Sequence, residues 1–194
     1  MSTVVAVRKN NKICIAADTL TSFGSNKKSA VYDKYPNKIV SVGEKMYLGL
    51  VGSAAHNLVI ESALAKEKKL PELHSRLVIF DFFRKLHRKL KNDYFLNPKE
   101  EEDDPYESSQ MELLMINRYG LFGVYSLREV FEYRKFWAIG SGSEYALGAM
   151  YALYDQLDSA SAIAEIGVKA GIEFDDGSAE PIDCYSLRLS QEDI

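Results

Sequence analysis

Cysteine and histidine are scarce in this chain, whose 194 residues include two cysteines and three histidines. Neither residue recurs at the spacing of a zinc site, so the sequence predicts no metal centre, and no other motif points to a bound cofactor. Cys14 and Cys184 lie inside apolar, strand-like runs. We therefore expect both to be small buried side chains in a reducing compartment.

Long apolar runs and strong charge are also lacking. No run approaches the roughly 20 apolar residues that cross a bilayer, and no basic-then-apolar leader precedes Val4. The formal net charge is -4, which argues against a nucleic-acid-binding surface. The sequence thus predicts a cytoplasmic protein that binds neither membrane nor nucleic acid. Its length fits one globular domain spanning residues 1–194.

The first eighteen residues are the most informative stretch. Two apolar, β-branched runs at 3–7 and 13–17 flank a polar segment in which Asn10 and Asn11 suit the positive-φ positions of a tight turn. Both runs are almost continuously apolar, which is typical of strands buried on both faces. We expect a β-hairpin at the centre of a layered protein.

The residue at the start of this hairpin could act as a nucleophile. Removal of Met1, which a small second residue favours, would leave Ser2 as the first residue, at the open end of a buried strand. An N-terminal serine carries a hydroxyl and an α-amine on adjacent carbons. An α-amine has a pKa of about 7.7–8, so part of it is neutral near pH 7 and can accept the hydroxyl proton. Serine is also simply common after an initiator methionine, so Ser2 alone decides nothing.

The remainder of the chain consists of blocks of strands and blocks of helices. After an excursion with little regular structure at 19–37, the expected elements are strands at 38–42 and 46–51, helices at 54–69 and 75–94, a strand meander at 112–139, helices at 144–157 and 160–174, and a strand at 182–189. Ser53 and Ser159 are expected to cap helices. This order indicates the α+β class and favours a four-layer αββα sandwich, two antiparallel sheets between helix pairs.

Residues 97–110 form an acidic segment that contains Pro98 and Pro105. This composition is typical of a mobile loop. A docking or substrate-gating role is the alternative.

Five short motifs in register resemble those of proteasome β-type subunits, which are N-terminal-nucleophile (Ntn) hydrolases. The likeness is to the HslV-type bacterial peptidase subunit and above all to the bacterial proteasome homologue of β-proteobacteria. It covers nearly the whole chain and implies the same αββα fold. The motifs are the hairpin 2–18, Asn-Lys-Ile at 37–39, Gly-Leu-Val-Gly at 49–52, Ala-Ile-Gly-Ser-Gly-Ser at 138–143 and Asp-Asp-Gly-Ser at 175–178.

This resemblance implies a site in which the Ser2 hydroxyl is the nucleophile and the Ser2 α-amine is the base. Lys38 would tune the proton transfer, and Asp18 would hold Lys38 in place. Lys34 is the alternative lysine, because the preceding loop differs in length from the HslV pattern.

The resemblance also implies a backbone donor for the oxyanion, and the N–H of Val51 is the predicted one. Ser141, Asp175 and Ser178 match positions that support the N-terminus and its water. The segment 140–143 could instead bind phosphate, but it lacks the lysine of a P-loop and the strand–helix–strand context of a dinucleotide fold.

The sequence therefore predicts a threonine-type endopeptidase subunit with serine as its nucleophile. Serine lacks the methyl group that restricts the threonine side chain, so we expect a slower enzyme. If Met1 stays, the Ser2 nitrogen is acylated and the site is not formed.

The predicted assembly is a stacked double ring that degrades polypeptides, with an ATP-dependent unfoldase as a possible partner. Two heptameric rings would give a 14-mer, and hexameric rings are the alternative. Two other functions stay open: a ring-forming scaffold or binding chamber with little or no proteolytic activity, and an Ntn amidohydrolase of small molecules.

Overall fold

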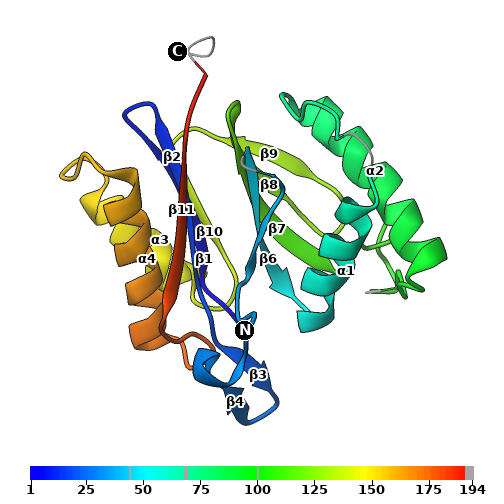
Figure 1. The fold of residues 1–194 in the computed structure, drawn as a ribbon, viewed down its shortest axis with the longest axis horizontal. Helices are drawn as coiled ribbons and strands as arrows, with labels where there is room; N and C mark the ends of the chain where they lie inside the picture. The colour runs from blue at the N-terminus through cyan, green and yellow to red at the C-terminus, as the bar shows by residue number, and fades with distance from the viewer. Residues whose placement is uncertain (44, 68–69, 100, 191–194) are drawn as a thin grey trace.

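The N-terminal hairpin lies in the middle of a four-stranded antiparallel sheet (Figure 1). The computed structural model describes residues 1–43, 45–67, 70–99 and 101–190. β1 (Val4–Lys9) and β2 (Lys12–Asp18) are joined through Asn10 at φ 49° and Asn11 at φ 58°, which confirms the predicted turn. The two outer strands of this sheet, in the order β10-β1-β2-β11, are β10 (Phe136–Ile139) and β11 (Ile182–Arg188).

The apolar residues of the hairpin pack on both faces of this sheet. In β1, Val4 and Ala6 face the core between the sheets, whereas Val5 and Val7 face the helices on the other side. β2 alternates in the same way. Since successive side chains of a strand point to opposite faces, a continuous apolar run needs a partner layer on each side.

The second sheet has five antiparallel strands in the order β5-β6-β7-β8-β9 and faces the first sheet across a shared apolar core. Short turns join β5 to β6, β7 to β8 and β8 to β9, whereas α1 and α2 lie in the connection between β6 and β7. The strands are β5 (Ile39–Ser41), β6 (Met46–Gly52), β7 (Met111–Asn117), β8 (Gly120–Val124) and β9 (Val130–Tyr133).

Helix pairs cover the outer faces of both sheets, which confirms the predicted αββα sandwich (Figure 1). Ser53 caps α1 and Ser159 caps α4, as predicted, by accepting from the N–H groups of Ala55 and Ala162 at 3.3 Å. The helices are α1 (Ala54–Ala65) and α2 (Arg76–Asp93) on the five-stranded sheet, and α3 (Ser143–Leu153) and α4 (Ala160–Phe174) on the four-stranded sheet.

Three segments differ from the sequence prediction or go beyond it. The excursion at 19–37 contains a small hairpin, β3 (Thr21–Phe23) with β4 (Asn26–Lys28), and a 3-10 turn, η1 (Ala30–Tyr32). The helix predicted for 54–69 ends at Ala65, and positions 68 and 69 lie outside the described residues. Position 100 of the acidic segment 97–110 also lies outside them, and the mobility of that segment stays a prediction.

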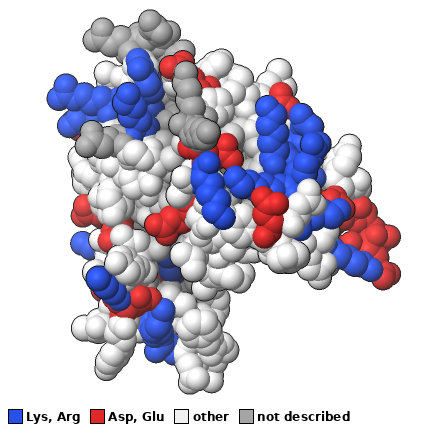
Figure 2. Space-filling model, turned by 45° about the vertical axis from the view of Figure 1, so that its right-hand side comes forward, with Lys and Arg blue, Asp and Glu red and all other residues white. Residues whose placement is uncertain are grey.

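The face of the molecule in Figure 2 carries Lys and Arg side chains next to Asp and Glu side chains. On α2, Arg84 pairs with Asp81, and Lys89 pairs with Glu67, which follows α1. Among the described residues, none of the helices combines the length and the apolar character needed to span a membrane.

Candidate active site

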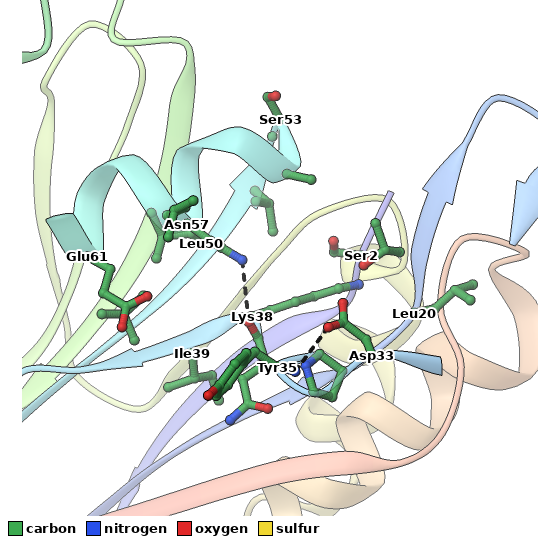
Figure 3. Close-up of a pocket in the computed structure, with 18 of the residues that line it drawn as sticks. Ser2, Leu20, Asp33, Tyr35, Lys38, Ile39, Leu50, Ser53, Asn57 and Glu61 are labelled. Carbon is green, nitrogen blue, oxygen red and sulfur yellow. Dashed lines mark hydrogen bonds between the residues drawn. The ribbon is translucent and has the colours of Figure 1, made fainter. Parts of the chain in front are cut away.

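An open cleft of about 820 Å³ lies beside Ser2. Its walls come from the excursion at 19–37, the adjoining ends of β5 and β6, and one face of α1. Figure 3 shows Ser2 and Lys38 on one side of this cleft and Asn57 and Glu61 of α1 on the other. The cleft therefore gives a ligand access to Ser2 and Lys38, two of the predicted site residues.

Asp18, the last residue of β2, is the most heavily bonded side chain of the site. It has no exposed surface (0%). Its Oδ1 accepts from Lys38 Nζ at 2.7 Å and from the N–H of Thr3 at 2.9 Å. Its Oδ2 accepts from the N–H groups of Leu20 at 3.0 Å and Ala179 at 3.2 Å. A buried carboxylate with this many donors is held in one orientation.

Lys38 is buried and points from the start of β5 towards Ser2 (Figure 3). Its carbonyl accepts from the N–H of Leu50 at 3.0 Å, which fixes its backbone to β6. Burial lowers the pKa of Lys38, and the carboxylates of Asp18 and Asp175 offset part of this effect. The competing Lys34 is exposed, with its ammonium group over its neighbour's ring, so the structure places only Lys38 beside Asp18.

A second carboxylate network supports the backbone of Ser2. The Ser2 N–H donates to Ser141 Oγ at 3.0 Å, and Ser141 Oγ donates to Asp175 Oδ2 at 2.9 Å. Ser178 Oγ donates to the same Asp175 oxygen at 2.7 Å. We call Ser2, Ser141, Asp175 and Ser178 the Ser2 network. Ser141 precedes α3, and Asp175 and Ser178 follow α4, so the packing of this helix pair brings them together beside Ser2.

The loop before α3 approaches the backbone of Ser2 closely. Gly140 has φ +94°, and a Cβ atom there would lie 2.2 Å from the Ser2 carbonyl oxygen. The N–H of Gly142 donates to the same oxygen at 3.2 Å. Only glycine fits at position 140, because both its dihedral angle and the close contact exclude a side chain.

The family model described as proteasome subunit matches residues 1–187. The chain belongs to the proteasome family. A proteasome subunit beta from Nanoarchaeum equitans (strain Kin4-M) is 28% identical over 198 residues, which cover 96% of this chain and 93% of the relative.

Solved structures agree with this assignment. The bacterial proteasome homologue (BPH) of Thiobacillus denitrificans, in complex with epoxomicin, is 43% identical to this chain. The match has a TM-score of 0.90 and covers 97% of this chain and 99% of that one. The structure titled only as the BPH gives 44% identity and the same TM-score, 0.90, with 98% and 100% covered. The eukaryotic HslV from Trypanosoma brucei shares the fold at 20% identity and a TM-score of 0.66, over 96% and 99% of the chains.

The sheet register of this proteasome-family chain does not suit Val51 as an oxyanion donor. The N–H of Leu50 points towards β5, because it donates to Lys38, and N–H groups alternate in direction along a strand. The N–H of Val51 therefore points into the pairing with Glu112 of β7. The N–H of Gly52 points to the β5 side again, past the start of that strand, and Gly52 lines the cleft. By its direction, the N–H of Gly52 is therefore a better candidate than that of Val51 for an oxyanion donor, a role that stays a prediction.

Ser2 carries Met1 in this chain, so its nitrogen is an amide and its hydroxyl donates to the Met1 carbonyl. An amide nitrogen cannot act as a base, whereas the free amine left by removal of Met1 can. Within the described part of the chain, no group of His, Cys, Asp and Glu side chains could hold a metal ion.

Two residues of the site, Thr3 and Gly140, were not predicted from the sequence. Thr3 contributes its buried hydroxyl, which lies 2.7 Å from Ser178 Oγ. Gly140 contributes the close backbone approach described above. A glycine between a strand and a helix is a weak signal, and nothing near Thr3 in the sequence marks it, since its partners are far along the chain.

Proposed function

We propose that this proteasome-family subunit is a peptidase that cleaves peptide bonds with Ser2 as an N-terminal nucleophile, once Met1 has been removed. The observation that carries the proposal is the buried Lys38–Asp18 pair, whose lysine points towards Ser2 at the wall of an open cleft (Figure 3). A buried cation beside a potential nucleophile at an accessible cleft is the arrangement expected of a catalytic site.

The contacts support a consistent order of proton transfers. The free amine of Ser2 would keep its hydrogen bond to Ser141 Oγ, which leaves a lone pair to take the hydroxyl proton, directly or through a water. The Ser2 oxygen then attacks the substrate carbonyl carbon. The N–H of Gly52 stabilises the developing oxyanion. The protonated amine next gives its proton to the leaving amine, and water hydrolyses the acyl-enzyme by the same route.

Lys38 and Asp175 have supporting roles in this mechanism. The Lys38 ammonium group lowers the energy of negative charge that develops on the Ser2 oxygen, and Asp18 keeps that ammonium group in place. Asp175 acts through Ser141, whose oxygen it orients towards the Ser2 nitrogen. Ser178 donates to the same oxygen of Asp175 and so helps to hold that carboxylate in place.

The family and its structural neighbours support assembly into rings, which would enclose the Ser2 sites in a chamber. Likeness to the Thiobacillus denitrificans BPH favours two stacked heptameric rings, a 14-mer, over the hexameric rings of the HslV pattern. Polypeptide chains would then be the substrates. An ATP-dependent unfoldase would have to feed such a chamber, in the cytoplasm.

A second candidate function depends on whether Met1 is kept. With Met1 in place, the Ser2 nitrogen is acylated, and a chain that kept Met1 would be a ring-forming scaffold or binding chamber with little or no proteolytic activity. The third candidate, a small-molecule amidohydrolase, would need no ring. Size-exclusion chromatography with light scattering separates it from the other two.

The mass of the intact, denatured chain tests the proposal. It is measured before and after exposure of the native protein to a peptide epoxyketone, whose ketone and epoxide carbons can bond to a hydroxyl and an adjacent amine. We expect the wild-type chain to lack Met1 and to gain one adduct, located at Ser2 by fragmentation.

Ser2→Ala is the control, and it is expected to gain no adduct. A chain that lacks Met1 and yet never reacts with the epoxyketone or with a β-lactone would contradict the peptidase function. A chain that keeps Met1 as purified would favour the scaffold.

A further inference from the structure

Thr3, the residue after the proposed nucleophile, belongs to both carboxylate networks of the site. Its N–H donates at 2.9 Å to Asp18 Oδ1, the oxygen that also accepts from Lys38. Its hydroxyl Oγ1 lies 2.7 Å from Ser178 Oγ. Thr3 has no exposed surface (0%) and does not line the cleft. Thr3 therefore links the contacts of Asp18 and Lys38 to the Ser2 network, at a position that the cleft does not expose.

The number of hydrogens fixes the direction of the hydroxyl bonds. A serine hydroxyl has one hydrogen to donate, and a carboxylate only accepts. Ser178 Oγ and Ser141 Oγ both donate to Asp175 Oδ2, at 2.7 and 2.9 Å. Thr3 must therefore be the donor in its bond to Ser178. Ser141, whose hydrogen is also committed, has its lone pairs free to accept from the nitrogen of Ser2.

Two glycines confine the Thr3 hydroxyl to this orientation. A Cβ atom on Gly142, before α3, would lie 2.0 Å from Thr3 Oγ1, and one on Gly171, in α4, would lie 2.2 Å from it. No side chain fits at either position without displacing the hydroxyl. The β-branched threonine also has few alternative rotamers. The surrounding backbone thus holds the hydroxyl against Ser178.

We propose that Thr3 is a positioning residue for Ser2. Its hydroxyl fixes Ser178, Ser178 and Ser141 together fix Asp175, and Ser141 orients the Ser2 nitrogen. This inference rests on the proposed function, because the role is defined relative to that nucleophile. Loss of the Thr3 hydroxyl is expected to slow the reaction of bound inhibitor about 10-fold, the effect of roughly one hydrogen bond. Binding itself should not weaken, since Thr3 does not line the cleft.

The test compares Thr3→Val with Thr3→Ser and with wild type, all with Met1 removed. The rate of epoxyketone adduct formation is measured against inhibitor concentration, which separates the maximal rate from the half-saturating concentration. Thr19→Val is the matched control, because Thr19 is also buried but donates to the Pro181 carbonyl at 2.8 Å, outside the Ser2 network. If valine at position 3 prevents folding, Thr3→Ala removes the same hydroxyl.

The expected result is a maximal rate about 10-fold lower in Thr3→Val at an unchanged half-saturating concentration, with Thr3→Ser and Thr19→Val close to wild type. In a Ser178→Ala background, Thr3→Val should have no further effect, because the hydroxyl acts through Ser178. Two results would overturn this inference alone. One is an equal maximal rate for Thr3→Val and wild type, and the other is a further loss of about 10-fold when Thr3→Val is added to Ser178→Ala. A processed wild-type chain that forms no adduct would overturn the proposed function and this inference together.

Discussion

Among the described residues, two polar clusters combine a serine, a proton-binding side chain and a carboxylate, but only in the first does the serine line a cleft. Ser2 opens onto the 820 Å³ cleft, with Lys38 and Asp18 behind it. In the other, His87 Nδ1 lies 2.9 Å from Ser109 Oγ, and His87 Nε2 lies 3.3 Å from a Glu107 oxygen.

We call Ser109, His87, Glu107 and Arg128 the closed cluster. Ser109 is only 2% exposed, and Arg128 donates to its hydroxyl at 3.4 Å and to the Glu107 carbonyl. No substrate can reach such a hydroxyl. This cluster instead ties the end of the acidic segment 97–110 to α2. The comparison shows that residue types in a suggestive order define a site only when the nucleophile is accessible.

The largest expected effect comes from breaking the Lys38–Asp18 pair. Lys38→Met leaves the fully buried Asp18 charge without its partner, which should cost about 3–5 kcal/mol of unfolding free energy. Adduct formation at Ser2 should fall about 10²–10³-fold, as for the loss of an electrostatic stabiliser. Chemical denaturation and the mass assay measure the two effects.

Lys34→Met is the matched control for this change, because Lys34 is exposed, and it should alter neither quantity. The double variant Asp18→Asn with Lys38→Met removes both charges, so it keeps the test open if the single variant does not fold. Wild-type adduct formation in a folded Lys38→Met chain would contradict the role given to Lys38.

Gly140→Ala tests the close approach of the loop before α3 to the backbone of Ser2, a feature that Ser109 of the closed cluster does not have in this comparison. The alanine would need φ +94° and would place its Cβ 2.2 Å from the Ser2 carbonyl oxygen. We expect a loss of about 1–3 kcal/mol from the dihedral strain, with slower adduct formation because Ser2 must move. Gly148→Ala, where nothing lies within 4 Å, should leave both unchanged or stabilise α3 slightly.

Ser109→Ala tests the closed cluster itself. The change leaves His87 Nδ1 buried without its partner, so it should cost about 1–3 kcal/mol. Adduct formation should stay at the wild-type rate once the chain is folded. A large loss of reactivity in the folded variant, compared at a temperature well below its melting point, would show that the two clusters are coupled.

The smallest expected effect is on pH dependence. Burial lowers the pKa of His87, Glu107 raises it in part, and Arg128 and Lys91 lower it further. An unfolded chain therefore takes up this proton more readily than the folded one below about pH 6.5, and folding stability is lost as the pH falls. In His87→Gln, the melting temperature should therefore fall less between pH 7.5 and pH 5 than it does in wild type. An equal fall in the two chains would contradict the role given to His87.

Local features of the fold could be predicted because their causes are local. The paired asparagines of the hairpin, the serine caps and the alternation of strand blocks with helix blocks each depend on a few neighbouring residues. The helix predicted to reach residue 69 ends at Ala65, and Lys66 and Glu67, which follow it, are exposed and have no core to pack on.

The site required more than local pattern. Asp18, Lys38, Ser141, Asp175 and Ser178 came from resemblance, since no spacing rule joins residues that far apart. The oxyanion donor was predicted at Val51 rather than Gly52 because the directions of the N–H groups of β6 depend on its register with β5 and β7, which the sequence does not show. The role of Thr3 could not be predicted at all, because it depends on two glycines brought in by α3 and α4.

The four donors to Asp18 also have a consequence for the order in which this chain folds. They belong to positions 3, 20, 38 and 179, and β11 pairs with β2 from Ile182 opposite Asp18. Contacts between such distant segments form late, because long loops must close first. A nascent or truncated chain that lacks its last strand therefore cannot assemble the surroundings of Ser2. Under the proposed function, reactivity at the first residues would wait for the synthesis of the last ones, and an unfinished chain would not cut its neighbours.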